Sequence, residues 1–169
     1  MIEIRQATTA EELDSVRTLV HAFMDWARQI YPDLQNLTDE NFKTVEAELA
    51  SLPGAYGPPT GRLLLAYYDG KAAGTVAMRD LGDRICEMKR MFVYEKFRGK
   101  GIGRALTMAL INEARTLGYS HMRLDTGPRH YAAQGLYRSL GFQEIPPYYE
   151  VPEDFRSMSV FMELDLEKG

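Results

Sequence analysis

The spacing of apolar residues along the chain changes between the two-residue period of strands and the longer period of helices. Ile2 and Ile4 alternate with charged residues, which predicts a first strand with one buried face. Thr8 or Thr9, followed by two glutamates, supplies a helix start, and apolar side chains recur at helical spacing from there to Ala27. The chain therefore opens with a strand and an amphipathic helix.

A second helix is predicted after a short break. Tyr31 precedes a proline and ends the first helix, because the residue before proline is disfavoured in the helical region. The next helix is predicted to begin at Thr38, with an apolar face formed by Phe42, Val45 and Leu49. A loop rich in proline and glycine follows over residues 52–61.

Three strands joined by short turns are predicted in the middle of the chain. Residues 63–68 and 71–79 flank the pair Asp69-Gly70, which is typical of a tight hairpin turn. Gly74, inside the second of these strands, indicates a bulge or the close approach of another backbone. A turn over residues 81–83 leads into a third strand that ends at Val93. Strands connected in this way are antiparallel.

Strands alternate with helices only in the later part of the chain. One helix over residues 102–117 is stopped by Gly118, and another over residues 131–140 is stopped by Gly141. Further strands are predicted at residues 122–126, 142–145 and 159–166. This order predicts an α+β (mixed α/β) fold. A length of 169 residues with 45% hydrophobic content fits a single domain over residues 1–169.

Three glycines, Gly99, Gly101 and Gly103, lie between the third predicted strand and the next helix, in a segment (residues 98–104) that we call the glycine loop. The start of a helix presents unpaired N–H groups and partial positive charge, and glycine lets an anion approach them closely. Residues 84–104 carry seven basic and two acidic side chains. This local field favours a multiply charged anion such as a phosphate.

Two other phosphate-binding motifs do not match the glycine loop. The Walker motif ends in Gly-Lys-Ser/Thr, and the dinucleotide fingerprint requires glycine where this chain has Arg104. A dinucleotide-dependent enzyme is therefore disfavoured. By itself, a Gly-x-Gly-x-Gly pattern is equally compatible with a strand-to-helix turn that needs glycine only for its conformation.

Two motifs resemble one known family. Residues 98–103, Arg-Gly-Lys-Gly-Ile-Gly, follow Met-Phe-Val and resemble the acyl-CoA-binding motif of the GNAT N-acetyltransferase superfamily. Residues 133–142, with Leu-Tyr and then Gly-Phe, resemble that family's later helix. The resemblance covers roughly residues 63–166. It implies a GNAT acyl-CoA transferase fold, in which a central, mostly antiparallel twisted sheet splays apart between strands four and five and carries helices on both faces.

The same resemblance implies acetyl-CoA (coenzyme A) as the cofactor and indicates which residues would bind it. These are Met91, Phe92, Val93, Arg98, Gly99, Lys100, Gly101, Ile102, Gly103, Arg104 and His130. The backbone N–H of Met91 or Val93 is the expected donor to the developing oxyanion. His130 stands where many members have an asparagine that contacts the pantetheine chain, so the chain departs from the family pattern at this contact.

Two side chains are candidates for proton transfer. Glu87 lies where histone-type members of the family carry a glutamate base, and Tyr137 matches the tyrosine that protonates the departing thiolate. A base is useful because an alkyl amine with a pKa near 10.4 is neutral in only about one molecule in a thousand at pH 7. A Glu87 carboxylate paired with Lys89 or Arg90 is an equally good interpretation, and a buried structural role is the alternative for Tyr137.

Composition limits the remaining function classes. The net charge of -4 argues against nucleic-acid binding. A single cysteine, Cys86, excludes an intrachain disulfide and a cysteine metal cluster. We expect its thiol to be buried in a strand and not to carry an acyl group. No set of His, Asp and Glu residues has the spacing of a metal site. The sequence has no apolar run long enough for a membrane span and no signal peptide at its start, so a cytoplasmic location without a membrane partner is expected.

The acceptor is the least determined feature. We expect an N-acetyltransferase that acts by direct attack in a ternary complex on a small-molecule amine or amino-acid-like acceptor, with a protein amine possible. Residues 1–50 carry a net charge of -6, which mildly favours a cationic acceptor, although solvated helix faces explain it better. The alternative function is a non-catalytic acyl-CoA-binding regulatory domain. The sequence also leaves a homodimer possible.

Aromatic residues from both ends of the chain are candidates for the acceptor side. Phe23, Trp26 and Tyr31 could line a substrate pocket, but aromatic residues at helical spacing more often belong to the core. The family layout implies that Tyr148 and Tyr149 lie near the acceptor.

Overall fold

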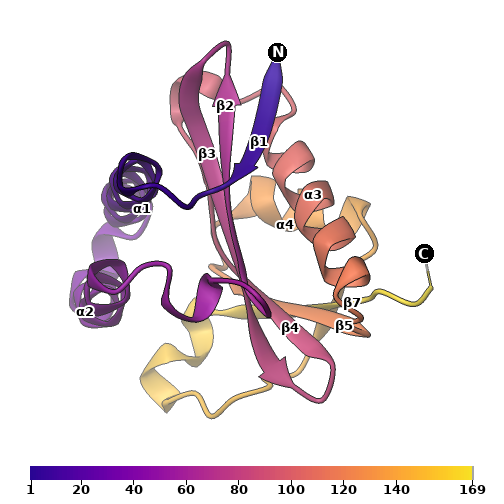
Figure 1. Ribbon diagram of the computed structural model, residues 1–169. Helices are drawn as coiled ribbons and strands as arrows, with labels where there is room; N and C mark the ends of the chain where they lie inside the picture. The colour runs from indigo at the N-terminus through magenta and orange to yellow at the C-terminus, as the bar shows by residue number, and fades with distance from the viewer. Residues whose placement is uncertain (169) are drawn as a thin grey trace.

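The computed structural model describes residues 1–168, in which seven strands form one sheet with the order β1-β2-β3-β4-β5-β7-β6 (Figure 1). The strands are β1 (Ile2–Gln6), β2 (Arg62–Tyr68), β3 (Lys71–Gly82), β4 (Ile85–Val93), β5 (His121–Thr126), β6 (Gln143–Ile145) and β7 (Val160–Asp165). The α-helices are α1 (Ala10–Ile30), α2 (Gln35–Ala50), α3 (Ile102–Thr116) and α4 (Tyr131–Ser139). Among the strands of the described residues, only β4 and β5 pair in parallel. The predicted mixed α/β fold with a mostly antiparallel sheet is confirmed.

Helix α1 begins and ends where local chemistry requires. The Thr9 hydroxyl accepts the Glu12 N–H at 3.1 Å, and the Glu12 carboxylate accepts the Thr9 N–H at 3.0 Å, which completes a capping box. The helix stops before Pro32, as predicted. Helix α2 starts at Gln35, three residues earlier than the predicted Thr38, because the 3-10 turn Pro32–Leu34 leads directly into it.

The hairpin between β2 and β3 confirms the role predicted for two glycines. Asp69 and Gly70 both have positive φ angles, +49° and +82°, as a tight hairpin turn requires. The register shifts next to Gly74, and a Cβ at Gly74 would lie 3.0 Å from the carbonyl oxygen of Phe92. Gly74 therefore lies beside a bulge and allows β4 to approach closely.

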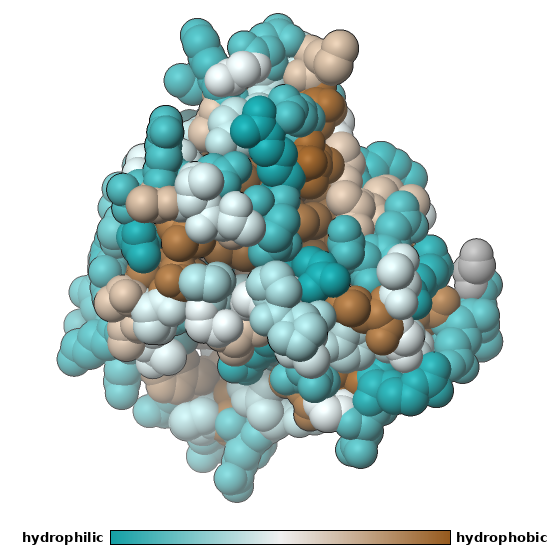
Figure 2. Space-filling view, viewed as in Figure 1, coloured by the Kyte–Doolittle hydropathy of each residue, from teal (hydrophilic) through white to brown (hydrophobic). Residues whose placement is uncertain are grey.

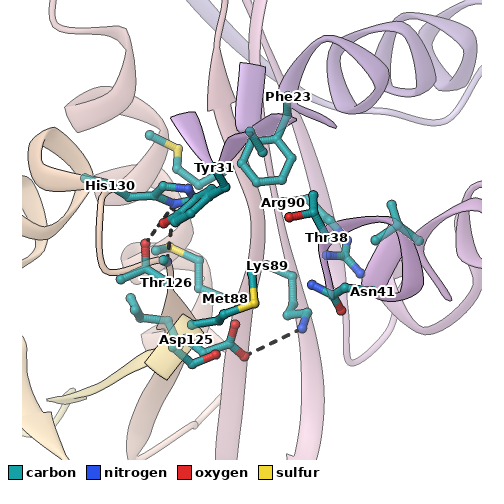
Figure 3. A pocket seen from close by; sticks show the side chains of 18 of the residues that line it. Phe23, Tyr31, Thr38, Asn41, Met88, Lys89, Arg90, Asp125, Thr126 and His130 are labelled. Carbon is teal, nitrogen blue, oxygen red and sulfur yellow. Dashed lines mark hydrogen bonds and ion pairs between the residues drawn. The ribbon is translucent and has the colours of Figure 1, made fainter. Parts of the chain in front are cut away.

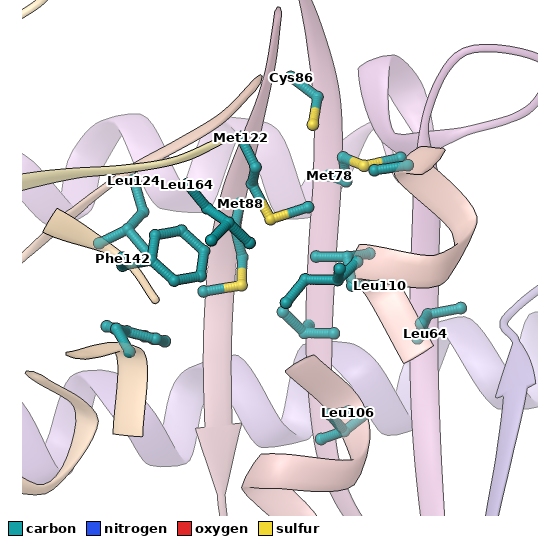
Figure 4. Close-up of a cluster of buried hydrophobic side chains, with 14 of the residues drawn as sticks. Leu64, Met78, Cys86, Met88, Leu106, Leu110, Met122, Leu124, Phe142 and Leu164 are labelled. Carbon is teal, nitrogen blue, oxygen red and sulfur yellow. The ribbon is translucent and has the colours of Figure 1, made fainter. Parts of the chain in front are cut away.

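The sheet separates two hydrophobic layers. Helices α1 and α2 cover one face, and α3 and α4 cover the other (Figure 1). The layer under α3 is shown in Figure 4, where Leu106 and Leu110 of that helix lie among side chains of the sheet. The face shown in Figure 2 is largely hydrophilic, and its apolar side chains form narrow bands between polar ones. Among residues 1–168, no helix combines the length and apolar character that crossing a membrane requires.

Strands β4 and β5 run together for only part of their length. Their parallel pairing extends over Ile85–His121, Cys86–Met122 and Glu87–Arg123 and then ends. Beyond Glu87, β4 continues to Val93 without β5 beside it. The sheet therefore opens at this edge, which confirms the splay implied by the family resemblance and exposes β4 backbone to a cleft.

Candidate active site

The glycine loop ends in an open helix start. Gly99 and Gly101 have φ angles of +80° and +83°, and a Cβ added at either residue would meet no atom within 4 Å. The first helical hydrogen bond of α3 runs from the Ala105 N–H to the Gly101 carbonyl at 3.0 Å, so the amides before Ala105 have no partner inside the helix. Open backbone with unpaired N–H groups and positive dipole fits the diphosphate of an acyl-CoA.

Most of the predicted cofactor residues line one cavity, which we call the glycine-loop cavity. They are Met91, Phe92, Val93, Arg98, Gly99, Gly101, Ile102, Gly103 and His130. Lys100 and Arg104 are not among its lining residues. The Lys100 ammonium lies 5.2 Å from the centre of the Tyr68 ring, and an Arg104 Nη1–H donates to the Ser139 hydroxyl at 3.2 Å.

Arg98 lies over the aromatic wall of the glycine-loop cavity. Its guanidinium carbon is 5.0 Å from the Trp26 ring centre and 5.5 Å from that of Phe92. Its Nε–H also donates to the Val93 carbonyl at 3.3 Å. These contacts hold a cation at the point where the β4 backbone meets the glycine loop.

A bulge in β4 changes which side chains face the cleft. Arg90 has a φ angle of +58°, and β4 places Arg90 and Met91 opposite the single residue Val76 of β3. Before the bulge, Met88 packs in the layer under α3; after it, Met91 and Val93 do so. The extra residue therefore reverses the alternation, and nothing in the sequence indicated it because arginine is unusual at positive φ.

A second cavity of ≈ 160 Å³, which we call the α2 cavity, is shown in Figure 3. It lies between α1, α2, the bulged part of β4, the end of β5 and α4. It shares Phe23, Met91, His130 and Ala133 with the glycine-loop cavity. Phe23 and Tyr31 line it, and Phe23 and Trp26 line its neighbour, so these aromatic residues are both core and cavity wall.

Tyr137 lies at the α2 cavity on α4. The residue is 4% exposed, and burial, reinforced by the Asp125 carboxylate, raises the pKa of its hydroxyl above the ordinary value of 10. Within residues 1–168 its hydroxyl makes no hydrogen bond. A protonated hydroxyl that reaches a cavity without a fixed partner is chemically able to donate a proton there.

Glu87 lies outside the α2 cavity, in a third cavity that also includes Arg79, Lys89 and Tyr148 and that we call the tyrosine cavity. The residue is 1% exposed. Its Oε1 accepts from Arg79 Nε at 2.7 Å, and its Oε2 accepts the Tyr148 hydroxyl at 2.6 Å. Of the two ion pairs considered from sequence, the one with Lys89 is present at 4.0 Å, and the one with Arg90 is not, because Arg90 pairs with Glu48. A base role for Glu87 remains a prediction.

Asp125, at the end of β5, is a cavity carboxylate that the sequence did not single out. It lines the α2 cavity with Tyr137, and its Oδ2 accepts the Tyr149 hydroxyl at 3.0 Å. Lys89 Nζ lies 3.9 Å from the same oxygen (Figure 3). An alternating strand pattern alone did not distinguish Asp125 from the other charged residue of β5, Arg123.

His130 is held as a neutral ring where the two main cavities meet. Its Nδ1 accepts the Gly127 N–H at 3.3 Å, so the neutral ring carries its proton on Nε2, which is buried without a partner. The Trp26 ring centre is 5.0 Å away. Burial lowers the pKa of His130 to about 4. The unpaired Nε2–H is a donor available to a bound ligand.

The end of α1 is tied to the loop after β5. The Arg129 guanidinium donates to both carboxylate oxygens of Asp33, at 2.6 and 2.8 Å, and to the Ile30 carbonyl at 2.9 Å. The Arg129 N–H donates to the Tyr31 hydroxyl at 3.0 Å. These bonds hold the cavity walls contributed by α1 against the loop that carries His130.

Cys86 has the buried environment expected of it. Its side chain is fully buried, and burial raises the pKa of the thiol to about 12. It lines none of the three cavities. In the described part of the chain, no group of three or more His, Cys, Asp or Glu side chains is arranged to hold a metal ion.

Comparisons with known proteins agree on one family. The profile of the "Acetyltransferase (GNAT) family" matches residues 18–142. An uncharacterized N-acetyltransferase of Schizosaccharomyces pombe is 35% identical over 169 residues, which cover 99% of this chain and 96% of the relative.

Solved structures show the same architecture. A GNAT-family acetyltransferase from Staphylococcus aureus has a TM-score of 0.76 at 20% identity, covering 98% of this chain and 99% of that chain. The PaiA N-acetyltransferase from Thermoplasma acidophilum, crystallised in complex with coenzyme A, has a TM-score of 0.71 at 16% identity with the same coverage. At sequence identities of 20% and 16%, these two similarities show the fold alone.

Proposed function

Because the chain belongs to the GNAT acetyltransferase family and is an acyltransferase, we propose that it transfers the acetyl group of acetyl-CoA to a primary amine of a small molecule. The proposal rests mainly on the meeting of two cavities at the exposed β4 backbone, with Tyr137 on one side and the glycine loop on the other. Two adjoining cavities suit a ternary complex, in which the amine attacks the thioester directly.

Acetyl-CoA would supply the thioester, and the glycine-loop cavity would hold it. The unpaired N–H groups at the start of α3 would bind the diphosphate, with Arg98 adding positive charge. The part of β4 from Met91 to Val93, which has no pairing with β5, would hold the pantetheine arm and donate an N–H to the thioester oxygen.

Proton transfers at the α2 cavity complete the proposal. The N–C bond forms as the S–C bond breaks, and an ammonium group gives up two protons in the process. We assign the first proton to the Asp125 carboxylate, which passes it to solvent. The Tyr137 hydroxyl protonates the departing sulfur, and the second proton from nitrogen restores the hydroxyl. Glu87, held by Arg79 and Tyr148, is the competing base and would act from the tyrosine cavity.

The experiment is a thiol-release assay with acetyl-CoA and a panel of small primary amines. Tyr137→Phe should lower kcat by about 10²- to 10⁴-fold, the usual contribution of a general acid, while the Kd for coenzyme A stays within about twofold. The control is Tyr119→Phe, which removes a buried hydroxyl bonded to the Thr60 carbonyl at 2.7 Å outside the cavities. Coenzyme A binding without turnover of any amine would support the regulatory-domain alternative.

A further inference from the structure

Lys89 brings a largely buried cation to the α2 cavity, and its ammonium group makes no hydrogen bond within residues 1–168. The side chain is 18% exposed. Its Nζ forms ion pairs with Asp125 at 3.9 Å (Figure 3) and with Glu87 at 4.0 Å, but both separations exceed hydrogen-bond distance. An ammonium group has three donors, and leaving them unused in a buried site is unfavourable. Lys89 is therefore available to an anionic group of a ligand.

Asp125 provides the opposite charge on the same wall. Its Oδ2 accepts one hydrogen bond, from Tyr149, and its Oδ1 accepts none from the described residues. The carboxylate can therefore accept hydrogen bonds from a ligand ammonium group. Lys89 and Asp125 are neighbours, so the cavity presents a cation and an anion side by side.

The charges around the two side chains are balanced. Arg79, Glu87, Lys89 and Asp125 alternate in sign, with separations of 2.7, 4.0 and 3.9 Å. Arg90, the other cation at the cavity, is already paired with Glu48 at 2.6 Å. A ligand with a net charge would leave one charge uncompensated in a partly buried site, which is costly. A ligand that carries both signs avoids this cost.

The first half of the chain contributes no acidic group to the α2 cavity. Its lining residues from α1 and α2 are aromatic, aliphatic or neutral polar, namely Phe23, Ala27, Tyr31, Thr38, Asn41, Phe42 and Val45. The acidic character of residues 1–50 therefore does not form an anionic pocket for a cationic acceptor. The cavity has a volume of ≈ 160 Å³, which suits a small-molecule acceptor.

We propose that the acceptor is a small, apolar α-amino acid, whose carboxylate binds Lys89 and whose amino group binds Asp125. This inference rests on the proposed function and adds the chemical class of its acceptor. In such a molecule a single carbon joins the two charged groups, which matches the adjacent cation and anion of the cavity. Phe23, Phe42 and Val45 provide an apolar wall for its side chain.

The test compares leucine with its decarboxylated counterpart, 3-methylbutylamine, and with leucinamide, in wild type and in Lys89→Met. The variant should lower kcat/KM for leucine by about 10- to 100-fold, the effect of losing a charge-assisted hydrogen bond. The kcat/KM values for 3-methylbutylamine and leucinamide, which lack the carboxylate that Lys89 would bind, should not fall by more than about threefold, which also shows that the variant is folded. For each acceptor, the ratio of kcat/KM between wild type and Lys89→Met is compared, so differences in basicity among the three amines cancel.

The control variant is Lys71→Met, which removes an exposed lysine on the hairpin between β2 and β3. It should leave kcat/KM unchanged for all three acceptors. Equal losses for all three acceptors in Lys89→Met, or a wild-type enzyme that uses leucine no better than that variant does, would overturn the inference. Calorimetric titration of leucine into protein saturated with coenzyme A separates the two proposals. Lys89-dependent binding of leucine without turnover of any amine would support a binding site for an α-amino acid and overturn the proposed function. The absence of both leucine binding and turnover of any amine would overturn both proposals.

Discussion

Tyr148 and Glu87 lie 61 residues apart in sequence and share a hydrogen bond of 2.6 Å between the phenol hydroxyl and Oε2 of the carboxylate. The carboxylate is 1% exposed and also accepts from Arg79. Burial and the nearby Glu87 charge raise the pKa of Tyr148, so the hydroxyl keeps its proton and remains a donor. This bond fixes the segment after β6 against β4, at the tyrosine cavity.

Tyr148→Phe should lower the free energy of unfolding by about 1.5–3 kcal/mol, because it removes a donor from a buried charged acceptor. Urea denaturation monitored by tryptophan fluorescence measures the change. The matched control is Tyr149→Phe, which removes a hydroxyl from the neighbouring residue, 44% exposed and bonded to Asp125. Tyr149→Phe should lower the free energy of unfolding by less than Tyr148→Phe does. Equal decreases would show that the hydrogen bond to Glu87 stabilises the protein no more than the bond to Asp125 does.

The two carboxylates near the cavities should differ in their effect on turnover. Asp125→Asn should lower kcat/KM for every amine by about 10²- to 10⁴-fold, because the residue lines the α2 cavity and is the base of the proposed mechanism. Glu87→Gln should lower kcat/KM by less than about tenfold, because both of its oxygens already have partners. The pH dependence of kcat/KM for both variants is the measurement. The opposite ranking in folded proteins would establish Glu87 as the base.

The sequence predicted those parts of the site that depend on local chemistry. The glycine loop needs positive φ at Gly99 and Gly101 and lies between a strand and a helix, and both features are visible in the order of residues. The position of Tyr137 on a later helix followed from the second motif in the same way. These features are set by neighbours in sequence, so pattern and resemblance were sufficient.

Contacts across the fold were not predictable in this way. The bulge at Arg90 reverses the alternation of β4, and no glycine or proline marks it. The ion pair of Glu87 with Arg79 depends on the register between β3 and β4, and its bond to Tyr148 depends on a distant segment. Lys89 and Asp125 come together only because β4 and β5 are adjacent in the sheet. Pairing and register decide these contacts, and neither is encoded locally.

The open backbone of the glycine loop can be tested with a pair of glycine variants. Gly101 and Gly70 have nearly the same φ angle, +83° and +82°, and a Cβ at either residue would meet no atom within 4 Å. Alanine at either position should therefore cost a similar 1–2 kcal/mol or so of stability, because positive φ is strained for residues with a Cβ. Only Gly101→Ala should also weaken coenzyme A binding, by about tenfold or more, through the approach of the ligand to the backbone.

Isothermal titration of coenzyme A into both variants gives the answer. Gly70 lies on the hairpin between β2 and β3, so Gly70→Ala controls for backbone strain alone. If both variants bind coenzyme A like the wild type, the diphosphate does not lie against the start of α3. If both variants bind coenzyme A more weakly and to the same extent, the cause is a loss of folded protein and not a loss of contact between coenzyme A and the glycine loop.

His130 should make the stability of the protein dependent on pH in the acidic range. Its folded-state pKa is lowered by burial to about 4, against 6.5 for an unperturbed histidine. The unfolded chain therefore binds a proton between pH 6.5 and pH 4 that the folded protein does not bind. By linkage, the free energy of unfolding decreases as the pH falls through this window. Between pH 7 and pH 5 the contribution is about 1–2 kcal/mol.

His130→Asn should remove this contribution, because asparagine does not titrate, and the difference in unfolding free energy between pH 7 and pH 5 should shrink by the same 1–2 kcal/mol or so. Urea denaturation at the two pH values measures it. The control is His21→Asn, since His21 is exposed on α1, where it lies 2.8 Å from Glu46. That substitution should change the difference by less than about 0.5 kcal/mol, as surface substitutions usually do. An unchanged difference in His130→Asn would mean that His130 has the same pKa in the folded and unfolded states, so that the ring gains a proton in the folded protein between pH 7 and pH 5 and its Nδ1 then no longer accepts the Gly127 N–H.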